Sequence, residues 1–286
     1  MKPITLLVAT ERDIIDSEVS IMLSASEMKM LIQVWRCYSL GDSYDIVVSN
    51  LESNHTLKEY VKDENYFKKN GETKTIIYKT EILCPLKSEN RIPVLLLFSN
   101  PHPRSIISGM FLSPEGDVNR FWLSMQCAEM FKLPNETVIG KGSFPEPIRQ
   151  IFLNLEYQSH FVFHFYPFFS FPSRNPQELE RIFGEYFTSH MINESRWNLL
   201  EFVELKSINH IVCFGKQAFQ HISTFDEVSL RGYTKTIKKE GFIHSLFNIS
   251  SQNINLYLTL PTSQGRCKAR ERIDSLKRIK VEIQKR

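Results

Sequence analysis

The chain has 286 residues, of which 42% are hydrophobic and 12% aromatic, and a formal net charge of +3. This composition is typical of one large folded domain or two ordinary ones and excludes a disordered chain. Because the sequence has no apolar run of about 18 residues, we expect no membrane-spanning helix. The first residues, MKPITLLVATERD, pass from a short apolar run directly to charges, so we expect no signal peptide.

Residues 1–88 are expected to form an N-terminal extension or subdomain, ahead of a main domain that spans residues 89–286. Within the extension, residues 26–35 have a helical pattern, residues 44–49 resemble a strand, and residues 74–83 form a second β-like run. This part of the sequence carries the weakest periodic signals.

The main domain contains four short apolar runs that are typical of buried strands. They span residues 92–98, 160–165, 210–214 and 254–260. Helical patterns separate them, in residues 120–131, 146–155 and 216–224. Residues 175–178 are a strong helix start, with Asn175 as the cap and Pro176 at the first position. Because strands that alternate with helices form parallel sheets, we expect a three-layer α/β fold with a central, mainly parallel four-stranded sheet flanked by helices. Residues 226–250 are expected to form an exposed hairpin or flap.

The ends of these four strands are where we expect the functional residues. Carboxyl ends of parallel strands meet at one edge, so the segments 100–101, 166–167, 215–216 and 261–263 are expected to lie together. The most prominent polar residue among them is Asn100, which ends an unbroken apolar strand and precedes Pro101. An Asn in this position either caps the next turn or serves as a site residue.

The cysteines and the glycines exclude several kinds of site. The five cysteines are widely spaced, odd in number and form no CxxC pair, so we expect no disulfide framework and no metal or iron–sulfur cluster. A reducing, cytoplasmic setting fits this usage best. Glycine-rich GxGxxG and Walker patterns are absent, which argues against a standard dinucleotide or nucleotide site. We expect no cofactor.

The last 21 residues are strongly basic. Residues 266–286 contain nine Lys or Arg against three acidic residues, and Ile273, Leu276, Ile279 and Ile283 recur at helical spacing. Two interpretations are open: a solvated terminal helix, or a helix that faces the phosphates of a nucleic acid.

Five motifs occur in an order that resembles a known family. They are residues 100–103 (NPHP, followed by Gly109), 161–168 (FVFHFYPF), 174–179 (RNPQEL), 214–218 (FGKQA) and 260–263 (LPTS). Together they resemble the uracil-DNA glycosylase superfamily, and most closely its single-strand-selective monofunctional members. The resemblance covers roughly residues 90–280 and lies in the ordered set rather than in any single motif. It implies a uracil-DNA glycosylase-like fold and cleavage of a base from DNA.

The chain departs from the family at several polar positions. The family's motif-two His falls on Leu260, its base-reading Asn falls on His164, and the Gly after Asn-Pro is His102. Asn100 is retained, and the resemblance implies that it holds the attacking water, with His102 as a second candidate catalytic residue.

The resemblance also implies a base-binding site and a DNA-binding surface. His164, Phe111 and Leu260 are the expected base-binding residues. Core packing is the simpler interpretation of His164 and an open alternative for Phe111, which is the candidate stacking face for the base. The expected DNA-binding residues are Ser263, Arg266, Lys268, Arg270 and Lys277.

The resemblance predicts a monomeric DNA glycosylase of DNA repair or phage defence, with single- or double-stranded DNA as its partner and no membrane. Its substrate is expected to be a deaminated, damaged or modified pyrimidine, for example a bulky modified cytosine of phage DNA. Two alternatives stay open: a catalytically silent DNA-binding module of the same fold, and a non-DNA α/β enzyme that uses His102 or His164.

Overall fold

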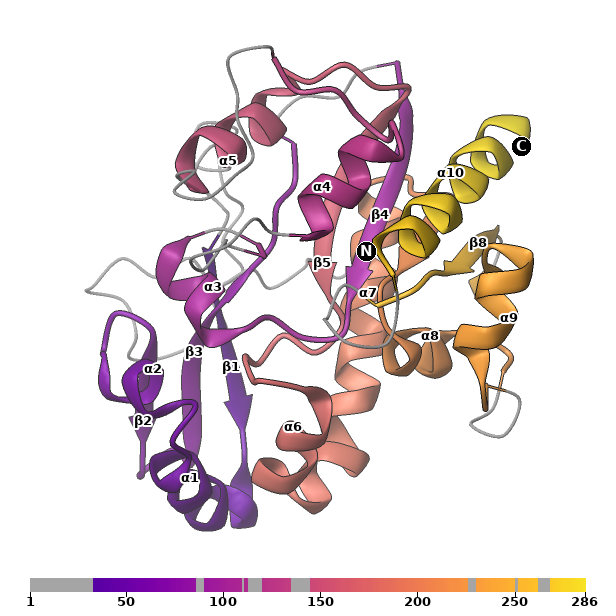
Figure 1. The fold of residues 1–286 in the computed structure, drawn as a ribbon. Helices are drawn as coiled ribbons and strands as arrows, with labels where there is room; N and C mark the ends of the chain where they lie inside the picture. Colours follow the sequence, from indigo (N-terminus) through magenta and orange to yellow (C-terminus); the bar gives the residue numbers. More distant parts are fainter. Residues whose placement is uncertain are drawn as a thin grey trace.

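A computed structural model describes most of the chain. The described residues are 33–85, 90–109, 111–112, 120–134, 145–225, 230–249, 252–261 and 268–286. They form a five-stranded, mainly parallel sheet and a separate three-stranded antiparallel sheet (Figure 1). The predicted α/β class is therefore confirmed, with one strand more in the central sheet than expected.

The central sheet has the strand order β5-β4-β6-β8-β7. Its strands are β4 (Ile92–Phe98), β5 (Phe161–Pro167), β6 (His210–Cys213), β7 (Ile243–Ile249) and β8 (Gln252–Leu258). The four predicted strands are parallel to one another, and β7 pairs with β8 in the antiparallel direction.

The fifth strand corrects one expectation. The described part of the segment 226–250 contains helix α9 (Tyr233–Glu240) and strand β7. Strand β7 pairs with β8 as a hairpin within the central sheet, so the segment is not an exposed flap. Phe247 is buried in β7, whereas Leu246 and Asn248 are exposed. This strand therefore has one buried face, as expected for an edge strand, and lacks the continuous apolar run of the central strands.

Helices cover both faces of the central sheet. Helices α4 (Arg120–Cys127), α5 (Pro145–Asn154) and α10 (Ala269–Lys285) share one hydrophobic core with Val94 and Leu96 of β4. Helices α6 (Pro176–Phe183), α7 (Ile192–Leu205) and α8 (Lys216–Ile222) share the other core with Leu95 and Leu97. Alternate β4 residues thus enter different cores, which explains the absence of a polar face in its sequence.

The N-terminal part forms the antiparallel sheet β1-β3-β2 and two helices. Its elements are β1 (Gln33–Ser39), α1 (Tyr44–Ser53), α2 (Lys58–Lys62), β2 (Phe67–Asn70) and β3 (Thr75–Glu81), with a short 3-10 helix (Gly41–Ser43) before α1. The β-like run at 74–83 is confirmed.

Two other expectations for this part are wrong. Residues 33–35 begin strand β1 and do not end a helix, while residues 26–32 lie outside the described residues. Residues 44–49 are helical, because Tyr44, Val47 and Leu51 bury one face of α1. The expected boundary near residue 88 falls in residues 86–89, which the structure does not describe.

The antiparallel sheet packs against the segment that follows β5. The hydroxyls of Tyr38 and Tyr78 lie 3.2 Å and 2.6 Å from the Ser170 hydroxyl. Beyond β3, Leu83 forms an antiparallel bridge with Phe165 of β5. The end of β3 is therefore held against the outer edge of the central sheet.

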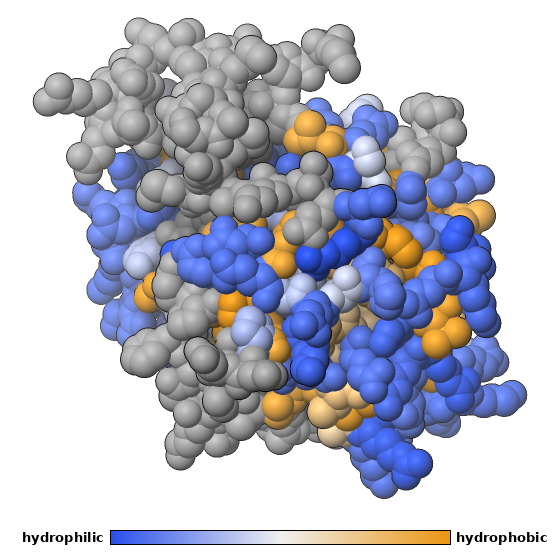
Figure 2. Space-filling model, turned by 90° about the horizontal axis from the view of Figure 1, so that it is seen from above, coloured by the Kyte–Doolittle hydropathy of each residue, from blue (hydrophilic) through white to orange (hydrophobic). Residues whose placement is uncertain are grey.

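The described residues on the face seen in Figure 2 are mostly hydrophilic, and apolar residues lie there in small separate groups. Within the described ranges, none of the helices combines the length and the apolar character needed to cross a membrane.

Gly241 provides a test of the contact between α9 and α10. Its φ is 97°, and a Cβ added there would collide with Arg278 of α10. We expect Gly241→Ala to lower the free energy of unfolding by about 2–4 kcal/mol, because left-handed strain and overpacking both contribute. Urea denaturation would measure this change.

The matched control is Gly232→Ala at the other end of α9. Gly232 has a φ of 69°, but no described atom lies within 4 Å of an added Cβ. Only the strain of about 1–2 kcal/mol is expected there. Equal losses in the two variants would contradict the proposed collision.

Candidate functional site

A pocket of about 600 Å³ lies at the carboxyl edge of the central sheet. Its walls come from the segments after β4 (residues 98–102), β6 (residues 214–217) and β8 (Pro261). The predicted gathering of these three segments is thus observed. The segment after β5 also takes part, although through residues 173–177 and not through residues 166–167.

Strands β4 and β5 remain hydrogen-bonded beyond their ends, which brings their loops together. The amides of Phe168 and Phe169 donate to the carbonyls of Phe98 and Ser99, at 2.7 Å and 2.8 Å. Farther along, the Ser173 amide donates to the Pro101 carbonyl at 3.0 Å. Asn100 lies between these contacts and lines the pocket.

The Asn100 side chain is held in one orientation by Ser173. Asn100 Nδ2 donates to the Ser173 carbonyl at 2.6 Å and lies 3.0 Å from its hydroxyl, and Ser173 itself is completely buried. Because a carbonyl only accepts hydrogen bonds, this contact identifies which amide atom is the nitrogen. None of the described residues donates to Asn100 Oδ1. The arrangement differs from a turn cap, in which this oxygen accepts from a backbone amide.

His102 follows Asn100 in the chain and begins helix α3 (Pro103–Ser108). Its Nδ1 accepts a hydrogen bond from the Arg104 amide at 3.3 Å, so the proton of the neutral ring is on Nε2. His102 is half-buried and lines the pocket beside Asn100.

Three phenylalanines form an aromatic wall of the pocket. The Phe98 and Phe214 rings are stacked with centroids 5.2 Å apart, and Phe111 lies 5.6 Å from Phe98. Phe111 is also buried against Phe165, at 5.9 Å. The predicted stacking residue is therefore at the pocket and in the core at the same time.

A buried carboxyl group that the sequence did not reveal also lines the pocket. Glu81 ends β3 and is only 1% exposed, and none of the described residues forms a hydrogen bond with its Oε2. Burial raises the pKa of Glu81 well above its ordinary value of 4.5. By the two-residue repeat of a strand, Glu81 belongs to the same face of β3 as Ile77 and Lys79, which are half-exposed. The local sequence pattern therefore carries no signal for the burial of Glu81.

His164 and Leu260, the other expected base-binding residues, do not line this pocket. His164 Nδ1 lies 3.3 Å from Cys84 Sγ, and its ring contacts Phe202 of α7. Burial, followed by the nearby Lys206, lowers the pKa of His164 to about 3. Leu260 is buried beside Arg272 in a separate small cavity. Both side chains therefore belong to the core, as the simpler interpretation of His164 had it.

The basic residues occur at the pocket and on the C-terminal helix. Arg174 and Lys216 line the pocket. Lys268 and Arg270 are exposed at the start of α10, and Lys277 is exposed in its middle. The helix buries the predicted residues Leu276, Ile279 and Ile283. Ser263 and Arg266 lie outside the described residues.

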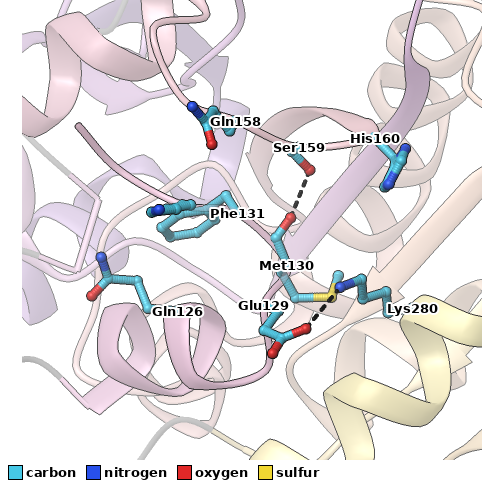
Figure 3. Close-up of a pocket in the computed structure, with 9 residues that line it drawn as sticks. Gln126, Glu129, Met130, Phe131, Gln158, Ser159, His160 and Lys280 are labelled. Carbon is cyan, nitrogen blue, oxygen red and sulfur yellow. Dashed lines mark hydrogen bonds and ion pairs between the residues drawn. The ribbon is translucent and has the colours of Figure 1, made fainter. Parts of the chain in front are cut away.

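A second pocket, of about 680 Å³, lies near the amino end of β5 (Figure 3). Two contacts join residues that line it: Lys280 pairs with Glu129 at 3.5 Å, and the Ser159 hydroxyl donates to the Met130 carbonyl at 2.6 Å. These contacts join the end of α4 to α10 and to the start of β5, which is a structural role.

In the part of the chain that the structure describes, no group of three or more His, Cys, Asp or Glu residues is placed to hold a metal ion. Comparison of the chain with protein-family models and with curated proteins found no match. The carboxyl-edge pocket is therefore interpreted from its own chemistry.

The burial of Glu81 predicts a specific pH dependence of stability. The folded protein retains the Glu81 proton at pH values where the unfolded chain has lost it. The stability linked to this proton is complete below about pH 4.5 and is lost as the pH rises toward the raised pKa. Because Gln cannot ionise, Glu81→Gln should become progressively more stable relative to the wild type, by up to about 1.4 kcal/mol per pH unit in this range.

Urea denaturation at several pH values between about 4 and 8 measures this difference. If the Gln amide itself destabilises the fold, it shifts the difference in unfolding free energy by the same amount at every pH and leaves the slope of that difference against pH unchanged. Glu180→Gln, the same change at an exposed position of α6, controls for the loss of a charge. A constant difference between wild type and Glu81→Gln across the range would contradict the prediction.

Proposed function

We propose that the protein is a DNA glycosylase, which hydrolyses the N-glycosidic bond of a deaminated, damaged or modified pyrimidine flipped out of DNA. The observation that carries the proposal is Asn100, which lines the pocket after β4 and whose amide nitrogen is held by Ser173, while none of the described residues donates to its Oδ1. The ordered motifs that resemble the uracil-DNA glycosylase superfamily give independent support.

The chemistry of this bond suits a site with few catalytic groups. As the bond breaks, the sugar becomes cationic and the base leaves with the bonding electrons. The protein must hold a water molecule near the sugar carbon C1′ and stabilise the departing base. Asn100 Oδ1 accepts a hydrogen bond from this water, and the two contacts to Ser173 hold the amide in place before substrate binds.

The shape and lining of the pocket support a flipped nucleoside as the ligand. Its volume of about 600 Å³ lies within the usual range for small-molecule sites. The wall of Phe98, Phe111 and Phe214 offers an apolar, aromatic surface to a base. Asn100, His102 and Glu81 add polar groups, as expected where one base must be distinguished from others.

The charges around the pocket support DNA as the partner. Arg174 and Lys216 line the pocket, and we assign to them the phosphates that flank the flipped nucleotide. Lys268, Arg270 and Lys277 provide further cations on α10. The sheet thus supplies the base pocket, while loops and the terminal helix supply phosphate contacts.

A second candidate function is a DNA-binding module without turnover. It is favoured by Leu260, a buried residue at the position where the resembled family carries a His. Loss of that His removes a hydrogen bond to the departing base. Release of a base by the wild type decides between the two functions.

The Asn100→Ala variant tests the proposed reaction. Because the water contact stabilises the transition state, base release should fall by about 10²–10³-fold, while affinity for DNA changes little. The assay incubates the protein with oligonucleotides that carry uracil, other deaminated bases or modified cytosines. Abasic sites are then detected by cleavage with alkali.

The matched control is Asn193→Ala, which removes an exposed amide of α7 that does not line the pocket. It should keep wild-type activity, and thermal unfolding should show that both variants are folded. Full activity of Asn100→Ala would remove the proposed role of Asn100 and make His102 the leading candidate.

The salt dependence of binding tests the DNA surface. Neutralising Arg270 and Lys277 together should weaken binding to every DNA sequence and reduce the slope of log affinity against log salt by about two, one for each lost phosphate contact. Fluorescence anisotropy at several salt concentrations measures both quantities. The control neutralises Lys58 and Lys62 on α2, which lies on the opposite side of the molecule in Figure 1. Binding that is indifferent to salt would argue against a DNA partner.

A further inference from the structure

We infer that Glu81 reads the base and donates a proton to it as it leaves, and that the base is a pyrimidine with an amino group at position 4, as in cytosine and its 5-substituted forms. This inference rests on the proposed glycosylase reaction and specifies its substrate class. It assigns a role to a residue from the antiparallel sheet, outside all five motifs that resemble the glycosylase family.

The position of Glu81 is the first argument. The residue is 1% exposed, yet it lines the same pocket as Asn100, and among described residues its Oε2 has no hydrogen-bond partner. Burying a carboxyl group without a hydrogen-bond partner lowers the stability of the folded protein, because the group loses its hydrogen bonds to water. A ligand with a complementary polar edge would supply the missing partner.

The fold explains how an N-terminal residue reaches this pocket. Leu83 bridges Phe165 in the antiparallel direction, with backbone hydrogen bonds of 3.1 Å and 2.8 Å. Glu81 precedes Leu83 by two residues, so it lies level with the carboxyl end of β5. The loop after β5 carries Ser173, which holds Asn100. Glu81 and Asn100 therefore line one pocket although they come from different sheets.

The protonation state of Glu81 decides what it can bind. Burial is the cause of its raised pKa, and the group is neutral over a wider pH range than an exposed glutamate. A neutral carboxyl offers one donor and one acceptor side by side. Cytosine offers the complementary pair, with N3 as acceptor and the 4-amino group as donor, and two hydrogen bonds can form.

Proton transfer from Glu81 then discriminates cytosine from uracil as a substrate. N3 of cytosine is far more basic than the carbonyl oxygens of uracil, so it can take a proton from a carboxyl group. Cytosine is also the poorer leaving group as an anion, so it gains more from a proton donor. After transfer the carboxylate accepts from both N3–H and the amino group, and both hydrogen bonds are kept.

The reaction balances as a hydrolysis. The bond between C1′ and the ring N1 breaks, its electron pair enters the ring, and the Glu81 proton goes to N3, so the base leaves neutral. The water held by Asn100 forms the new bond to C1′ and loses a proton to solvent. Glu81 regains a proton from solvent once the base has left. One water is consumed, and an abasic site and a free base are formed.

The other ionisable groups of the pocket bear on the pH dependence of this step. Besides Glu81 they are His102, Arg174, Lys216 and Tyr233. Base release should decline on the alkaline side as Glu81 loses its proton. Because these groups line the same pocket, only the part of the profile that disappears in a Glu81 variant belongs to Glu81.

The experiment compares base release from oligonucleotides that carry cytosine, 5-methylcytosine, 5-hydroxymethylcytosine or uracil. The proteins are the wild type, Glu81→Gln, Glu81→Ala and the exposed control Glu180→Gln. We expect the wild type to prefer amino-pyrimidines. Glu81→Gln keeps a donor and an acceptor but has no proton to give, so kcat should fall about 10²–10⁴-fold with little change in KM, and the alkaline decline should vanish. Glu81→Ala should also raise KM.

Other outcomes overturn the inference separately from the proposed function. If Asn100→Ala abolishes release while Glu81→Gln retains it, the glycosylase stands and the role of Glu81 is wrong. Preference for uracil has the same consequence. If the wild type releases no base, the glycosylase proposal and the acid role both fail. Calorimetry with free cytosine and free uracil then tests whether Glu81 recognises the base. A preference for cytosine that is lost in Glu81→Ala supports this role. Equal affinities of the wild type for the two bases overturn it.

Discussion

The backbone hydrogen bonds between β4 and β5 continue past the ends of both strands, and the candidate site depends on this continuation. Successive bonds join residues 98–101 to residues 168–173. They end where the Asn100 amide meets the carbonyl and hydroxyl of Ser173. A side chain that is held in this way needs no reorganisation before a reaction, which is the property that a water-positioning group requires.

The same edge of the sheet receives its polar groups from parts of the chain that are far apart. Asn100 and His102 follow β4, Lys216 follows β6, and Glu81 comes from the end of the antiparallel sheet. The antiparallel sheet is therefore more than an addition to the outside of the core, since its last strand carries a buried carboxyl into the pocket. Under the proposed function, this group takes over the stabilisation of the leaving base from the position that Leu260 occupies.

The apolar layers explain why some expected site residues are elsewhere. Side chains alternate between the two faces of β5, so Phe163 and Phe165 enter one core and His164 enters the other, against α7. Leu260 lies beyond the end of β8 and packs beside α10, because an aliphatic side chain is more stable in the core than at a polar pocket. Motif position alone cannot distinguish these environments, because neighbouring residues of a strand face opposite layers.

The sequence by itself determined the four parallel strands and their order along the chain, because strands covered on both faces leave unbroken apolar runs. It also determined the Asn175 cap of α6 and the apolar face of α10, which are local patterns. Only the tertiary structure decided that Ser173 holds Asn100 and that Glu81 is buried at the same pocket. The hydrogen bonds to Asn100 and the bridge from Leu83 to Phe165 join residues more than seventy positions apart. No local periodicity encodes contacts of that range, because they depend on how separate sheets pack.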